Sequence, residues 1–163
     1  MTHQPSALLP RFDAPQVQHD PARCLLRFQG LDRANAVVRP APAHGRELVV
    51  THRPTHALVD FTGMPPLSTQ DELWMSGHWL PRIARQPWQR VVPVPRPGQL
   101  PNQMAIEALF WFGRHLTRFQ FQVFDDVPPA LDWLVAGDRA AAQRLQAEWD
   151  AARPAPATPA LPT

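Results

Sequence analysis

Two hydroxyl side chains open a segment in which chemistry could take place. The stretch PPLSTQDELWMSGHWLPRI, residues 65–83, places Ser68 and Thr69 just before a helical pattern. Hydroxyls at this point either accept a phosphoryl group beside the helix dipole or cap the helix backbone. Asp71 follows Ser68 by three residues and puts negative charge at the positive end of the helix. Ser68 is therefore predicted to be an N-cap, with a phosphorylated switch loop at Ser68 and Thr69 as the alternative.

Other reactive side chains have simpler structural explanations. Asp125 and Asp126 could hold a hard cation, but Pro128 beside them predicts a helix start capped by an aspartate. His52 and His56 are four residues apart with a proline between them, so they do not share a helical face. No serine lies in Gly-x-Ser-x-Gly, and no glycine cluster forms a phosphate-binding loop. The expectation is a protein that is no enzyme and holds no cofactor or metal.

Residues 101–116, PNQMAIEALFWFGRHL, predict a helix that carries several large apolar side chains. The stripe expected to face the core comprises Ala105, Leu109, Phe112 and Leu116. This leaves Phe110 on the margin and Trp111 on the polar side of the helix. A tryptophan there indicates either an interaction surface or a site covered by residues 138–150 or by the Pro-rich tail. Trp74 and His78 raise the same question on the helix that follows Ser68.

Composition limits the classes of function. Apolar residues make up 44% of the 163 residues, enough for the core of one domain. The sixteen basic residues are all arginine, spread without a run, so no nucleic-acid-binding stripe is expected. Cys24 is the single cysteine, which leaves no disulfide framework within the chain. No apolar segment approaches membrane-spanning length and no signal peptide is evident, so a cytoplasmic protein is expected.

Strand-like and helix-like segments alternate along the chain, which predicts an α/β domain with a mixed sheet flanked by helices. The expected strands are residues 23–28, 56–62, 88–94 and 119–126. The expected helices are residues 68–85, 101–116, 128–134 and 138–150. Residues 33–42 are ambiguous: the Ala-Val-Val sequence fits a short strand, while Pro40 and Pro42 fit the start of a helix that continues to about His52.

Prolines and local composition divide the chain into four parts. Residues 1–21 are predicted to be irregular, 22–137 to form the α/β domain, 138–150 to form a C-terminal helix, and 151–163 to be a Pro/Ala-rich tail. Within the helix at 68–85, Pro81 clashes with the carbonyl four residues back, which belongs to Gly77. A kink near Gly77 is expected rather than a helix end.

Three short motifs, in this order, resemble the STAS-like (SpoIIAA-like) family of small bacterial proteins. They are Ser68 with Asp71, the Trp-Leu-Pro-Arg segment at 79–82, and Phe-Asp-Asp at 124–126 followed by the Ala-Leu-Asp-Trp-Leu segment at 130–134. The resemblance covers residues 22–136. It implies a mixed sheet of four or five strands with flanking helices. The Asp-Ser-x-Gly phosphoacceptor of anti-sigma-factor antagonists is missing after Asp60.

This resemblance implies a non-enzymatic, bacterial regulatory module that acts by binding a protein partner. A homodimer through an aromatic helix face is one form of such binding. The alternative is a SEC14-like protein that binds a lipid or another small apolar ligand. That reading requires an apolar cavity between sheet and helices, lined by Phe110, Phe112 and Phe119.

Overall fold

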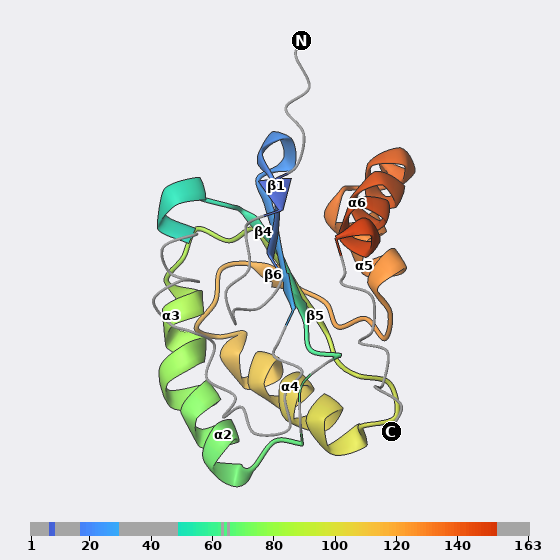
Figure 1. Ribbon diagram of the computed structural model, residues 1–163. Coiled ribbons are helices and arrows are strands. Elements are labelled where there is room, and N and C mark those ends of the chain that lie inside the picture. Colours follow the sequence, from blue (N-terminus) through green and yellow to red (C-terminus); the bar gives the residue numbers. More distant parts are fainter. Residues whose placement is uncertain (1–6, 9–16, 30–48, 63, 65, 153–163) are drawn as a thin grey trace, which may run out of the picture.

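The strands form one mixed sheet. The computed structural model describes residues 7–8, 17–29, 49–62, 64 and 66–152. The strand order is β1-β2-β3-β4-β5-β6, antiparallel from β1 to β3 and parallel from β3 to β6 (Figure 1). The strands are β1 (Ala7–Leu8), β2 (Val17–Asp20), β3 (Leu25–Gln29), β4 (His56–Asp60), β5 (Arg90–Val94) and β6 (Gln120–Phe121). The expected α/β class, with a mixed sheet flanked by helices, is confirmed.

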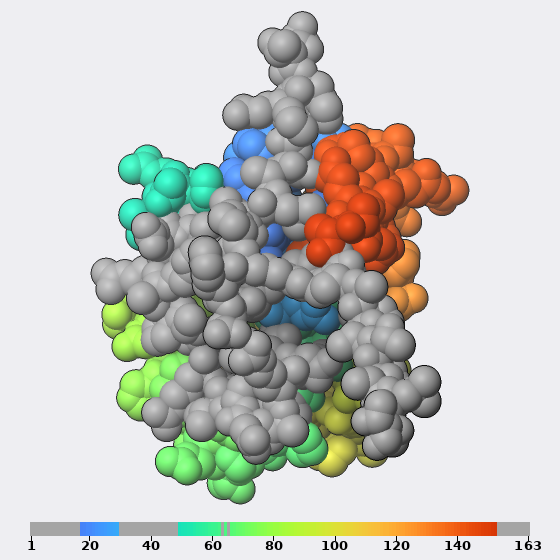
Figure 2. All heavy atoms as spheres, in the orientation of Figure 1, coloured from blue at the N-terminus to red at the C-terminus, as the bar shows by residue number. Residues whose placement is uncertain are grey.

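Helices cover both faces of this sheet. One group comprises α2 (Thr69–Trp74), the π-helical turn η2 (Met75–Trp79), α3 (Leu80–Ala84) and α4 (Leu100–Gly113). The other group comprises α5 (Val127–Leu134) and α6 (Arg139–Ala151). A short 3₁₀ turn, η1 (Pro21–Arg23), joins β2 to β3. Figure 2 shows the residues of α6 at the upper right and those of α2 at the lower edge.

The strands contribute to two hydrophobic cores, one on each face of the sheet, because successive side chains along a strand point to opposite faces. Each core lies between the sheet and one group of helices. Leu26, Ala57 and Val91 pack with α4 and with the segment α2–η2–α3. Their chain neighbours Leu25, Leu58 and Val92 pack with α5 and α6. The sheet is thus buried on both sides, as expected for parallel strands.

The prediction of an irregular segment at residues 1–21 is wrong for residues 17–20. These residues form β2, which pairs with β3 from Val17 opposite Phe28 to Asp20 opposite Leu25. The polar sequence VQHD gives little strand signal, because Gln18, His19 and Asp20 are buried by contacts with distant parts of the chain. Residues 7–8 form β1, Pro21 begins η1, and residues 1–6 and 9–16 lie outside the described residues.

The expected kink near Gly77 takes the form of a π-helical turn. Over Met75–Trp79 the helix widens, and the N–H of Leu80 donates to the carbonyl of Met75, five residues back. A wider turn leaves room for the ring of Pro81, which otherwise meets the carbonyl four residues earlier. The segment therefore continues through Pro81 as α3.

The remaining boundaries follow local chemistry. Pro93 lies in β5, next to the short edge strand β6. Its carbonyl accepts from the N–H of Phe124, so its missing donor faces the same side, beyond the end of β6. The strand expected at 119–126 is shorter than predicted, since β6 comprises Gln120–Phe121. The ambiguous residues 33–42 lie outside the described residues, and of the alternative helix through about His52, residues 49–52 are described and are helical.

Candidate functional site: the exposed face of α4

The inner face of α4 is anchored to the domain by close packing. Ile106, Leu109 and Phe110 are buried, and Phe110 meets the rings of Trp79 and Phe121. Gly113 lies against Leu80, where a Cβ would come within 2.6 Å of a Leu80 methyl carbon. This side of α4 is therefore committed to the core.

The first turn of α4 is tied to the loop that follows β4. Asn102 is almost fully buried, and its side-chain oxygen accepts from the N–H of Leu67 at 2.8 Å. Its side-chain nitrogen donates to Gln99, the residue before the helix. This pair of hydrogen bonds fixes the start of α4 relative to Ser68 and α2.

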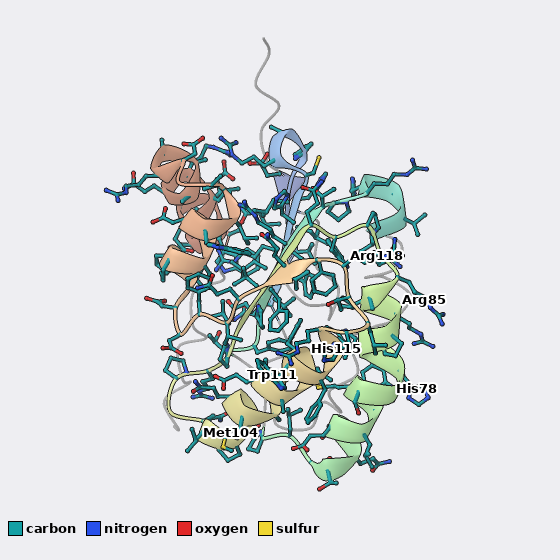
Figure 3. All side chains as sticks on the ribbon, turned by 180° about the vertical axis from the view of Figure 1, so that it is seen from behind. His78, Arg85, Met104, Trp111, His115 and Arg118 are labelled. Carbon is teal, nitrogen blue, oxygen red and sulfur yellow. The ribbon has the colours of Figure 1, made fainter. Side chains whose placement is uncertain are left out.

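The outer face of α4 is apolar as well, yet it is open to solvent. Its most exposed large side chains, with exposed fractions, are Leu100 (62%), Met104 (60%), Trp111 (57%) and Phe112 (75%). Ala108 is also exposed, so Leu100, Met104, Ala108 and Trp111 follow one another at intervals of three or four residues. At 3.6 residues per turn these side chains share one face. Figure 3 shows Met104 and Trp111 along α4 and His115 just beyond its end.

Polar side chains line one flank of this outer face. Glu107 accepts from Gln103 at 3.0 Å, and the guanidinium carbon of Arg114 lies 3.6 Å from the centre of the Trp111 ring. Neither Glu107 nor Arg114 has an ion-pair partner among the described residues. We call the set Leu100, Met104, Ala108, Trp111 and Phe112, with this flank, the α4 face.

A helix that is apolar on nearly every side normally has both faces buried. In the described residues, α6 packs on the opposite side of the sheet, so residues 138–150 do not cover Trp111. The Pro-rich tail beyond residue 152 lies outside the described residues. The exposed large side chains also include Leu116 (63%), just after α4, which extends the apolar surface beyond the helix end.

The predicted orientation of this helix is wrong at three positions. Phe112 and Leu116, expected in the core, are exposed, whereas Phe110, predicted to be part of an interaction surface, is 1% exposed. The periodicity was ambiguous because apolar residues surround the helix. Phe110, Phe112 and Phe119 also do not line one cavity, since Phe112 faces solvent while Phe119 is buried. Gly113 and Asn102 are the sequence signals that mark the inner face.

Trp74 and His78 lie on the neighbouring helical segment. Their rings are nearly parallel, with an interplanar angle of 9° and centroids 6.5 Å apart. Trp74 is half-buried against the core, and His78 is exposed. This pair is a small surface feature on α2 and η2, separate from the α4 face.

Ser68 is the N-cap of α2, as predicted. Its Oγ accepts from the N–H of Asp71, and the Asp71 carboxylate accepts from the backbone N–H of Ser68 at 3.0 Å. The same carboxylate accepts from the hydroxyl of Ser68 at 2.6 Å. A phosphate on Ser68 would meet this carboxylate and be repelled. Thr69 is exposed at the first position of α2.

The two carboxylates predicted to mark a helix start, Asp125 and Asp126, lie directly before α5. Asp126 is the N-cap of α5, and its carboxylate accepts from the N–H of Val127 at 2.8 Å. Asp125 is exposed. No cluster of three or more His, Cys, Asp or Glu side chains with metal-binding geometry occurs within the described ranges.

A buried polar layer between the sheet and α6 was not predicted from the sequence. Arg27 donates to Gln146 at 3.0 Å, lies 4.0 Å from the centre of the Trp149 ring, and approaches Asp60 at 3.8 Å. Asp20 accepts from Arg144 at 2.9 Å. The partners of Arg27 and Asp20 on α6 lie more than a hundred residues away in sequence, so local patterns carry no signal for the layer.

Two histidines in the sheet have lowered pKa values. Burial is the main cause for His19, and the neighbouring His52, whose ring centre is 4.2 Å away, lowers the pKa further. Asp20 acts in the opposite direction on His19. Burial also lowers the pKa of His56, with the charge of Arg90 adding to the effect.

A cavity of about 280 Å³ lies at the amino ends of β4 and β5. Arg23, His56, Arg90 and the end of α5 line it. Arg23 pairs with Asp138, and Arg90 donates to the carbonyl of Trp133 at 3.0 Å. These arginines thus fasten the end of α5 to the sheet and to the start of α6.

Comparison of the chain with protein-family models, with curated proteins and with solved structures finds no match. None of the described helices has the length and apolar character needed to cross a membrane. The α4 face is the feature from which a functional proposal can be argued.

Proposed function

We propose that this protein is a non-enzymatic, STAS-like interaction module that works in the cytoplasm and binds a protein chain through the α4 face. The observation that carries the proposal is the exposure of four large apolar side chains on one rigid helix. Exposed apolar patches of this kind mark interaction sites, and tryptophan is enriched where binding energy concentrates.

The packing of α4 supports this use of its outer face. Binding surfaces on rigid elements lose little conformational freedom when a partner docks. The close contact of Gly113 with Leu80 and the hydrogen bond from Leu67 to Asn102 hold α4 in place. Its outer side chains are therefore presented in a fixed arrangement.

A matched pair of substitutions tests the proposal. Met104→Glu places a charge in the α4 face, whereas Leu73→Glu places one on α2, at a residue of similar exposure (60% and 67%). We expect proteins retained from a lysate of the source cells by the wild-type chain to be lost with Met104→Glu and kept with Leu73→Glu. Equal recovery with both variants contradicts the proposal.

Native mass spectrometry separates this function from ligand carriage. An interaction module is expected to show the mass of the polypeptide alone or of a protein complex. A small apolar molecule that copurifies with the chain, and that Met104→Glu does not remove, would instead support the lipid-binding alternative.

A further inference from the structure

We infer that the chain bound at the α4 face is a second copy of this protein, related by a two-fold axis that makes the two α4 helices antiparallel. This inference rests on the proposed function and names its partner. It is argued from the spacing of side chains on α4 and from the charges on its flank.

The apolar spacing fits antiparallel helix pairing. Met104, Ala108 and Trp111 follow one another at intervals of four and three residues, the pattern that lets side chains of one helix fill the gaps of another. With the axis level with Leu109 and Phe110, Trp111 of each copy lies opposite Ala108 of the other. A large ring then meets a small side chain twice.

The same register fits the edge of the face. Ala105 of one copy lies about 3 Å along the helix axis from the level of Phe112 of the other, so the most exposed ring of the α4 face (75%) also has an alanine as a neighbour. Each of the two aromatic residues on one helix therefore has an alanine of the other helix at its level or within one turn of it.

Charge complementarity on the flank selects this orientation. In an antiparallel pair related by a two-fold axis, equivalent flanks of the two helices lie side by side. The flank carries Glu107 and, seven residues later, Arg114. In the register set by Trp111 and Ala108, Glu107 of one copy and Arg114 of the other differ in level by about 3 Å along the helix axis, which these long side chains can span, and the symmetry makes this contact twice.

Both charged residues are available for such contacts. Among the described residues Glu107 has only a hydrogen bond from Gln103, and Arg114 bonds His115 and stacks on Trp111. Seven residues along a helix span about 10 Å, too far for an ion pair within one copy. The two charges therefore complement each other only between copies.

Sedimentation velocity of the full chain over about 1–100 µM, a range that detects dissociation constants of weak and moderate dimers, tests the inference. The wild type is expected to form a dimer. Glu107→Arg or Arg114→Glu alone turns two attractions into two repulsions, and each is expected to weaken the dimer about ten-fold. Combining both substitutions restores opposite charges and is expected to restore the dimer.

Control variants use exposed charges away from α4. Asp125→Arg and Arg96→Glu reverse charges without a side-chain partner among the described residues, and they are expected to leave the dimer unchanged. Trp111→Ala is expected to give a monomer, with urea unfolding confirming that the variant is folded. This residue is 57% exposed, so its loss leaves the core intact.

Two outcomes overturn the inference. One is a wild-type chain that stays monomeric throughout the concentration range. The other is a dimer that the double reversal at Glu107 and Arg114 fails to restore. If the chain is monomeric while Met104→Glu still abolishes retention of another protein and Leu73→Glu does not, the partner is a different protein and only the dimer is refuted.

Discussion

Gly113 on α4 packs against Leu80 on α3 so closely that a Cβ at position 113 would lie 2.6 Å from one methyl carbon of Leu80 and 3.1 Å from the other. Leu80 is 3% exposed, so the surrounding core restricts its movement. The glycine sets how near the two helices come, and thereby the angle at which the α4 face is presented.

Gly113→Ala is expected to lower the free energy of unfolding by about 1–2 kcal/mol, because overpacking outweighs the gain in helix propensity. Gly77→Ala is the control, since a Cβ there meets no atom within 4 Å. That variant is expected to raise the free energy of unfolding by about 0.5–1 kcal/mol. Urea unfolding measures both, and stabilisation by both substitutions would show that Leu80 yields easily.

The capping box at Ser68 predicts a local effect on stability. Ser68→Ala removes the acceptor for the N–H of Asp71 and is expected to cost about 1 kcal/mol of unfolding free energy. Thr69→Ala, at the adjacent exposed residue, is expected to change it by less than about 0.5 kcal/mol. Urea unfolding of the two variants side by side makes the comparison. Similar losses in both would mean that Ser68 is not the cap.

The buried Arg27 predicts a large effect. Arg27→Met leaves Asp60 without its cationic neighbour and is expected to lower the free energy of unfolding by about 3 kcal/mol or more. Adding Asp60→Asn removes the stranded charge, so the double variant is expected to be more stable than Arg27→Met alone. Arg96→Met, on an exposed loop, serves as the control. A double variant less stable than Arg27→Met would contradict a charge-based explanation.

The lowered pKa of His19 predicts that stability falls in acid. A histidine whose pKa is lower in the folded state binds protons more readily when unfolded, so its contribution is complete above the ordinary value of 6.5 and is lost as the pH falls below it. The wild type is expected to be less stable at about pH 5.5 than at about pH 7.5. His19→Phe is expected to reduce this difference, and His56→Phe to do likewise. An unchanged difference in His19→Phe would show that His19 does not contribute.

Local chemistry allowed part of this structure to be predicted. The cap at Ser68, the cap at Asp126 and the irregular turn before Pro81 depend on residues within a few positions of one another. Strands β3 and β4 were recognisable because β3 begins with two buried leucines and β4 contains three successive buried apolar residues. These features therefore emerged from short windows of sequence.

The features that the sequence analysis did not predict depend on contacts between residues far apart in the chain. The face that α4 buries depends on Leu80 and Leu67, which lie outside the helix, and its own apolar periodicity allowed two orientations. β2 was missed because its polar residues Gln18 and Asp20 are buried through hydrogen bonds with α6, which the local sequence does not reveal. The residues of the candidate site were predicted with the same mixed success. Trp111 was recognised as exposed from its charged neighbours. Phe110 was predicted to lie at the surface and Phe112 in the core, and the structure shows the reverse.

The polar layer under α6 has a consequence for how the chain is made. The hydrogen bonds from α6 to Gln18, Asp20 and Arg27 join residues 127, 124 and 119 positions apart. During biosynthesis β2 and β3 therefore leave the ribosome long before α6, which supplies the hydrogen-bond partners of their buried polar side chains. Long loops must close before these contacts form, which slows folding. The polar layer is completed only when nearly the whole described chain has left the ribosome, so we expect α6 to be the last element to dock on the sheet.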